Sequence, residues 1–188
     1  MAKKTWPSYG SNFSSGTTDA IGVLVETFND LEMALRFVLL AFMDGHWQKN
    51  LIVVEQMSSI SIVDSIKAYF GLSKRKVILA PAIEFGMKAF ETCRVNRNNI
   101  VHFGMATRKE GAKVTRLIRR RFKGGQFAFS RQLKVGDVRR IADECHALKV
   151  YLDTLSVAVD SRGKFIEPER PAAPKVLDFE RRAYNYHV

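Results

Sequence analysis

Apolar residues recur at intervals of three and four along most of the chain beyond residue 16, which is the pattern of helices that bury one face. The first such stretch begins at Thr17 or Thr18, either of which can cap a helix, and it ends at Asp44-Gly45. Its apolar positions are Leu24, Phe28, Leu31, Leu35, Val38 and Phe42. The same spacing predicts further helices over about residues 47–57, 59–70, 81–97 and 137–160, with Pro81 as a first helical residue. Long helices joined by short links predict a mainly α fold, an antiparallel bundle of four to five helices.

Residues 112–134 follow a different pattern, in which apolar and polar residues alternate. Val114 and Ile118 belong to one run and Phe127 and Phe129 to the next, and a glycine-containing turn at residues 123–126 separates the two. This alternation predicts a two-stranded β-hairpin inserted into the helical bundle.

The two ends of the chain are predicted to lie outside the bundle. Residues 1–16 are rich in Ser, Gly and Asn and lack a sustained apolar period, which indicates a flexible arm. Residues 166–188 contain Pro168, Pro171 and Pro174 and are predicted to be a C-terminal tail with at most a short helix. Residues 17–165 are therefore expected to form one domain that includes the hairpin 112–134.

Three features of the sequence predict a cytoplasmic protein. Cys93 and Cys145 fall within predicted helices, which is typical of buried, reduced thiols. The first residues lack the apolar segment of a secretory signal. No run reaches the roughly 18 apolar residues of a membrane span, so no membrane partner is expected.

Positive charge is concentrated in one short segment. The chain has 30 Lys and Arg against 19 Asp and Glu, a formal net charge of +11, and residues 107–123 hold eight cations against Glu110 alone, which makes +7. This concentration predicts a polyanionic partner and favours nucleic acid over a membrane surface. The hairpin cations expected to contact phosphates are Arg116, Arg119, Arg120, Arg121 and Lys123. The alternative is a solvated face that keeps the protein soluble.

The motifs of the common nucleotide-binding, zinc and redox enzymes are absent, since the sequence has no G-x-x-x-x-G-K-[ST], G-x-G-x-x-G, H-E-x-x-H or C-x-x-C. His46, His146 and His187 have no carboxylate or thiol at chelating spacing, apart from Cys145, which points away from its neighbour His146 on a helix. No metal and no cofactor are therefore expected.

The segment Arg97-Asn98-Asn99-Ile100-Val101-His102, at the end of the predicted fourth helix, is the candidate for chemistry. Five steps of 100° place Arg97 and His102 about 140° apart on an ideal helix, and unwinding at the helix end is expected to bring both toward one cleft. These residue types suit metal-free RNA cleavage, in which the 2′-hydroxyl attacks the adjacent phosphate. His moves protons near neutral pH, Arg offers phosphate a permanent cation, and Asn98 donates a hydrogen bond or caps the helix end. The residues alone leave a purely structural role open.

The pattern Arg97-Asn98-x-x-x-His102 resembles the R-N-x-x-x-H motif of the HEPN domain, a family of helical bundles defined by an Arg followed a few residues later by a His. Residues 91–102 are similar to the polar, Arg-rich turn that closes a core helix in such proteins. Residues 28–32 are similar to the family's opening helix, in which an acidic residue often faces the active-site helix. The resemblance covers about residues 17–160.

The resemblance implies an endoribonuclease that acts without metal, with Arg97 and His102 as the catalytic pair and Asn98 as the positioning residue. Glu32 is expected to support the site by pairing with Arg97 or Arg94, with a plain surface glutamate as the alternative. Such domains commonly occur in toxin, antiphage and stress systems and usually act as dimers with paired motifs. The implied partners are thus RNA, a second copy of the chain, and an antitoxin or other protein.

Three hypotheses follow from the sequence. The leading one is a HEPN-like endoribonuclease, a toxin or antiphage defence effector, in which the hairpin arginines attract the RNA backbone. The second is a catalytically inactive RNA-binding module, whose salt-dependent affinity survives every change at Arg97 and His102. The third is a protein-interaction bundle for an acidic partner, which would not bind RNA even at low salt.

Overall fold

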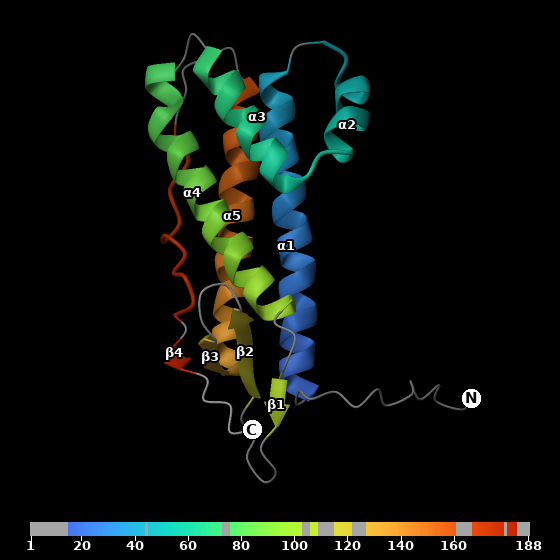
Figure 1. The fold of residues 1–188 in the computed structure, drawn as a ribbon. Helices are drawn as coiled ribbons and strands as arrows, with labels where there is room; N and C mark the ends of the chain where they lie inside the picture. The colour runs from blue at the N-terminus through green and yellow to red at the C-terminus, as the bar shows by residue number, and fades with distance from the viewer. Residues whose placement is uncertain are drawn as a thin grey trace, which may run out of the picture.

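The computed structural model of the protein describes residues 15–43, 45–72, 76–102, 106–108, 115–121, 127–160, 167–178 and 180–183 (Figure 1). In these ranges the chain forms five helices, namely α1 (Ser15–Phe42), α2 (Trp47–Glu55), α3 (Ser59–Leu72), α4 (Lys76–Val101) and α5 (Val135–Asp160). The mainly helical bundle predicted by the periodicity is therefore confirmed. No helix among the described residues is both long enough and apolar enough to cross a membrane.

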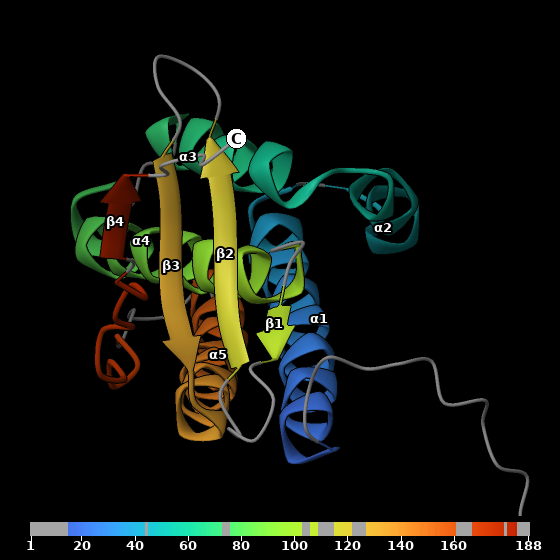
Figure 2. The same cartoon turned by 60° about the horizontal axis from the view of Figure 1, so that its bottom comes forward.

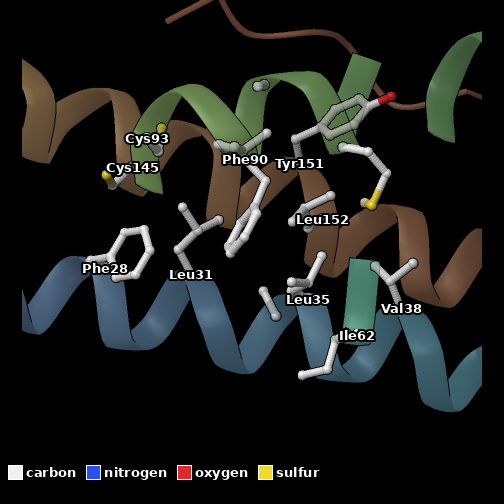
Figure 3. Packing of buried hydrophobic residues seen from close by; sticks show 14 of the residues in the cluster. Phe28, Leu31, Leu35, Val38, Ile62, Phe90, Cys93, Cys145, Tyr151 and Leu152 are labelled. Atoms are coloured by element: carbon white, nitrogen blue, oxygen red, sulfur yellow. The ribbon is translucent and has the colours of Figure 1, made fainter. Parts of the chain in front are cut away.

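Helices α1 and α5 pack against each other along most of their length and form the centre of the bundle (Figure 1). The apolar positions that predicted α1 face this centre, and Leu24, Leu31 and Leu35 are fully buried. Phe28 of α1 stacks on Phe90 of α4, with ring centroids 5.8 Å apart (Figure 3). The core thus joins α4 to the central pair of helices.

Helix α4 approaches α5 closely at Gly86. A Cβ atom at this position would lie 3.0 Å from Leu152 Cδ2, which is tighter than an ordinary van der Waals contact, so a side chain there would require Leu152 to shift by a few tenths of an ångström. One turn earlier, the hydroxyl of Tyr151 on α5 donates a hydrogen bond of 3.1 Å to the carbonyl of Ala82. These contacts fix the position of α4, the helix that carries the candidate motif.

The prediction that Pro81 begins a helix was wrong, because Pro81 lies inside α4. A proline at an interior position removes one backbone hydrogen bond. Leu79 before it and Ile83 after it are both buried in the same core. Burial of the extra leucine, about 2 kcal/mol, offsets the lost bond and lets the helix extend back to Lys76.

A four-stranded antiparallel sheet lies at the end of the bundle where α4 ends and α5 begins (Figures 1 and 2). Its strands are β1 (Ala106–Arg108), β2 (Thr115–Arg121), β3 (Phe127–Leu133) and β4 (Glu180–Ala183), in the spatial order β1-β2-β3-β4. β2 pairs with β3 from Thr115 opposite Leu133 to Arg121 opposite Phe127. β1 and β4, which the sequence pattern did not predict, pair with the outer edges of these two strands.

Residues 167–178 and 180–183, which were predicted to belong to a tail outside the bundle, pack against the bundle and the sheet. Residues 167–178, here called the C-terminal strap, have no regular secondary structure and run beside α4 (Figure 1). Leu177 of the strap is buried in the main core. Residues 180–183 then form β4 because they pair with β3, a partner that local sequence pattern does not reveal. Residues 1–14 of the predicted arm lie outside the described part of the chain.

Candidate functional site

Arg97 and His102 meet at the end of α4. The helix ends at Val101, and His102 N–H still donates a hydrogen bond of 3.0 Å to the Asn98 carbonyl. Arg97 Nη1 lies 3.0 Å from Nε2 of the exposed His102 ring. Because arginine is always protonated and only donates, His102 Nε2 accepts in this contact, and the neutral ring carries its proton on Nδ1. The structure thus brings together two residues that an ideal helix would point apart.

Asn98 contacts both members of this pair. Its side-chain Oδ1 accepts a hydrogen bond of 3.2 Å from Arg97 Nη1, while its backbone carbonyl accepts the bond from His102 N–H. The residue therefore orients the guanidinium and also holds the last turn that places the imidazole. Arg97, Asn98 and His102 therefore form one cluster, but without the predicted unwinding, because α4 stays helical to Val101 and the His102 N–H still bonds to the Asn98 carbonyl.

The guanidinium of Arg97 rests on the protein core. Its Cζ lies 5.6 Å from the ring centroid of Phe28, a distance at which a cation and an aromatic face attract. Nε of Arg97 is buried and has no hydrogen-bond partner among the described residues. A buried donor without a partner is destabilising, by about 1–3 kcal/mol.

The supporting pairs predicted for Glu32 and Arg94 were wrong. Glu32 accepts a hydrogen bond from the Ser59 hydroxyl at the first residue of α3, where the helix dipole also favours a carboxylate. Arg94 binds Glu91 on its own helix, with Nε 2.8 Å from Oε2 and Nη2 2.6 Å from Oε1, and this pairing lowers the pKa of the Glu91 carboxyl. Glu32 and Arg94 each bind a nearer polar partner and so do not join Arg97 or each other.

Arg94 and Glu91 line a pocket of about 720 Å³ between α3 and α4, whose apolar lining includes Ile83, Met87 and Phe90. Neither Arg97 nor His102 lines this pocket. The catalytic candidates therefore lie on a different surface, at the end of the helix.

The predicted RNA-binding cations fall in the sheet. Arg116, Arg119, Arg120 and Arg121 lie in β2, with Arg119 opposite Phe129 in the register (Figure 2). Lys123 lies outside the described residues. β1 begins four residues after His102, so the chain passes directly from the motif into this sheet.

The sequence analysis did not predict the roles of two residues beside the motif: Asn96, and Phe28, which was expected only as an apolar position of the first helix. Asn96 is completely buried on α4 and binds the C-terminal strap through both groups of its side chain. The signal for it was present, because Asn96 follows Cys93 by three residues and precedes Ile100 by four, at a position of the buried face. A polar residue in such a position requires a buried partner.

The thiols and imidazoles in the rest of the described chain do not form a metal site. Among the described residues, no three His, Cys, Asp or Glu side chains gather in a way that would hold a metal ion. Cys93 and Cys145 are free and buried, and a hydrogen bond with Cys145, together with burial, raises the pKa of Cys93. His146 is exposed, and His187 lies outside the part that the structure describes.

Comparison with known proteins adds no assignment. No protein-family model, no curated protein and no solved structure matches the chain, so the site is interpreted from its own residues.

Proposed function

We propose that the protein is a metal-independent endoribonuclease of the HEPN type, with Arg97, Asn98 and His102 at its reaction centre. The observation that carries the proposal is the 3.0 Å contact between Arg97 Nη1 and His102 Nε2 at the exposed end of α4. It joins a permanent cation to a group that moves protons near neutral pH, and such general acid–base help is worth about 10²–10⁴ in rate. The resemblance of residues 97–102 to the HEPN motif points to the same reaction.

In the proposed reaction, a phosphate of the RNA backbone enters beside Arg97. Arg97 Nη1 then donates to a phosphate oxygen in place of His102 Nε2, and the freed Nε2 accepts the proton of the ribose 2′-hydroxyl. A bond forms between the 2′ oxygen and phosphorus, and the bond from phosphorus to the 5′ oxygen breaks. The 5′ oxygen leaves with a proton taken from solvent, and His102 returns the proton that it accepted to solvent, which restores the neutral ring. The products are a 2′,3′-cyclic phosphate and a 5′-hydroxyl.

The environment of Arg97 supports its role as the phosphate-binding cation. Charge builds on the non-bridging oxygens in the transition state, and a donor already in place stabilises it without reorganisation. Phe28 below the guanidinium and Asn98 beside it restrict this long side chain before any ligand binds. Less side-chain freedom is then lost when phosphate arrives.

The arginines of β2 are proposed to attract the RNA. Eight cations in residues 107–123 give a strong local field, and β2 lies in the sheet at the motif end of the bundle. Attraction of this kind acts on the phosphate backbone and does not depend on sequence. It raises the local concentration of RNA beside Arg97 and His102.

The resemblance also guides the proposed setting of the protein. We propose a homodimer whose paired motifs line one cleft, acting in the cytoplasm as a toxin or antiphage effector with an antitoxin or other protein as regulator. The two buried, unpaired thiols agree with a reducing compartment.

The proposal is tested by incubating the purified protein with total RNA in the presence of EDTA. The wild-type chain is expected to cleave, because its chemistry relies on side chains. His102→Ala is expected to reduce cleavage by about 10² or more while RNA affinity stays within about twofold. His146→Ala is the matched control, since His146 is exposed on α5, and it is expected to behave as the wild type.

Full cleavage by His102→Ala would rule out the catalytic assignment. A wild-type chain that binds RNA with a strong salt dependence and never cuts it would instead identify the catalytically inactive RNA-binding module. No binding at low salt would leave the protein-interaction bundle.

A further inference from the structure

Asn96 joins the motif helix to a distant part of the chain. Its Nδ2 donates a hydrogen bond of 2.9 Å to the Lys175 carbonyl, and its Oδ1 accepts one of 2.9 Å from Leu177 N–H. The side-chain amide thus binds the backbone of the strap much as a neighbouring strand would. Asn96 is 0% exposed, so loss of either bond would leave a buried polar group unpaired.

The C-terminal strap is attached to α4 at more than one point. Leu177 is 2% exposed and packs in the main core. Near the start of the strap, Arg170 lies over the ring of Phe85, with Cζ 5.6 Å from the centroid, and it also pairs with Glu167. Asn96 provides a polar attachment at Lys175 and Leu177, in the second half of the strap.

The strap leads directly into the sheet. β4 begins three residues after Leu177 and pairs with β3 from Ser130 opposite Glu180 to Phe127 opposite Ala183. β3 in turn pairs with β2, which carries the arginines. A continuous backbone path therefore runs from Asn96 through the strap to the cationic strands, and Asn96 is the residue before Arg97.

We propose that Asn96 is a positioning residue that holds the sheet in place relative to Arg97 and His102. The inference rests on the proposed ribonuclease function and adds a residue outside its motif. β1 and β3 connect the sheet to the ends of α4 and α5, and the strap supplies a third connection at the opposite edge from β1. With the strap released, the sheet still carries its cations, but RNA is no longer held over the reacting pair.

A positioning role for Asn96 and a purely structural role predict changes in different measured quantities. A residue that only stabilises the fold would alter the free energy of unfolding and leave the folded enzyme fully active. A positioning residue lowers the cleavage rate at saturating RNA, because misplacement of a bound substrate by about 1 Å costs up to about 10² in rate.

The experiment uses the full chain and two variants that release the strap from opposite sides. Asn96→Leu keeps the approximate volume and removes both hydrogen bonds, and Leu177→Ala removes the apolar anchor while leaving Asn96 in place. Val38→Ala is the matched control, because it destabilises a fully buried position on α1, whereas Asn96 and Phe85, which bind the strap, lie on α4. Leu177→Ala keeps the test informative if Asn96→Leu does not fold.

Three readouts are compared: amide hydrogen exchange of residues 167–183, affinity for a short fluorescent single-stranded RNA, and single-turnover cleavage of that RNA at saturating enzyme. In both strap variants we expect exchange to rise about tenfold or more. The cleavage rate is expected to fall about tenfold, and the Kd to stay within about threefold of wild type. Val38→Ala is expected to keep wild-type exchange in the strap and the wild-type cleavage rate.

Two results would overturn this inference alone. One is unchanged hydrogen exchange in the strap of both variants. The other, given a wild type that cuts RNA, is increased exchange in the strap of the two variants together with a cleavage rate equal to that of Val38→Ala. Absence of cleavage by the wild-type chain would overturn the ribonuclease proposal and this inference with it.

Discussion

Arg97 lies across the face of Phe28, with Cζ 5.6 Å from the ring centroid. The two residues come from α4 and α1, so the position of the motif cation depends on how these helices pack. Phe28 also stacks on Phe90 of α4, with ring centroids 5.8 Å apart and an interplanar angle of 29°. A contact of this kind is worth about 0.5–2 kcal/mol, which is enough to bias one orientation of the guanidinium.

Phe28 and Phe90 offer a matched pair of substitutions for testing this contact. Phe28→Leu and Phe90→Leu both remove one ring of the stack, and each is expected to lower the free energy of unfolding by about 1–3 kcal/mol. Only Phe28→Leu removes the ring beneath Arg97, so single-turnover RNA cleavage is expected to fall about tenfold there and to stay within about twofold of wild type in Phe90→Leu. Equal losses of activity in the two variants would show that the contact does not matter for cleavage.

The contribution of β2 to RNA binding is measurable through salt. Replacing Arg119, Arg120 and Arg121 together by Gln is expected to reduce the slope of log Kd against log salt concentration by about 2, because each phosphate contact on a single strand contributes about 0.7. The control replaces Lys49, Lys67 and Arg139, three exposed cations of the helices. A similar loss of slope in the control variant would mean that the sheet is not the preferred RNA surface.

Because of Tyr151, the free energy of unfolding is expected to depend on pH in the alkaline range. Burial, and secondarily the negative charge of Glu167, raises the pKa of Tyr151 above its usual value, to about 12. Because the folded state favours the neutral hydroxyl, its stabilisation is complete below about pH 10 and is lost as the pH rises through about 12. Tyr151→Phe, which loses the bond to Ala82, is expected to be about 1 kcal/mol less stable near neutral pH.

Urea unfolding of the wild type and Tyr151→Phe between neutral pH and about pH 12 checks this expectation. The difference in midpoint is expected to stay constant up to about pH 10 and to shrink above it. A constant difference over the whole range would contradict the raised pKa.

The helices were predictable because their signal is local. Apolar residues at steps of three and four in α1 and α5 mark the faces that the structure buries, from Leu24 in one helix to Leu155 in the other. Pro81 misled the prediction of a helix start, since the local rule for proline ignores the burial of Leu79 in the preceding turn. At this position tertiary packing outweighs the low helix propensity of proline, and packing cannot be predicted from a short stretch of sequence.

The candidate site also has parts that were predictable from the sequence and parts that were not. Arg97, Asn98 and His102 lie within six residues, so their types and spacing were readable along the chain. The partner of Glu32 was not readable, because Ser59 reaches Glu32 from another helix. The partner of Arg94 could have been predicted, because Glu91 lies three residues away on the same helix.

The sequence by itself determined the helical class, the concentration of cations in residues 107–123 and the spacing of Arg97, Asn98 and His102, all of which depend on neighbours along the chain. Only the tertiary structure decided that Phe28 lies under Arg97, that β4 pairs with β3, and that Asn96 binds residues 79 and 81 positions away. These contacts join segments that meet only when the core forms. Their energy comes from burial and from hydrogen bonds shielded from water, which the folded chain alone provides.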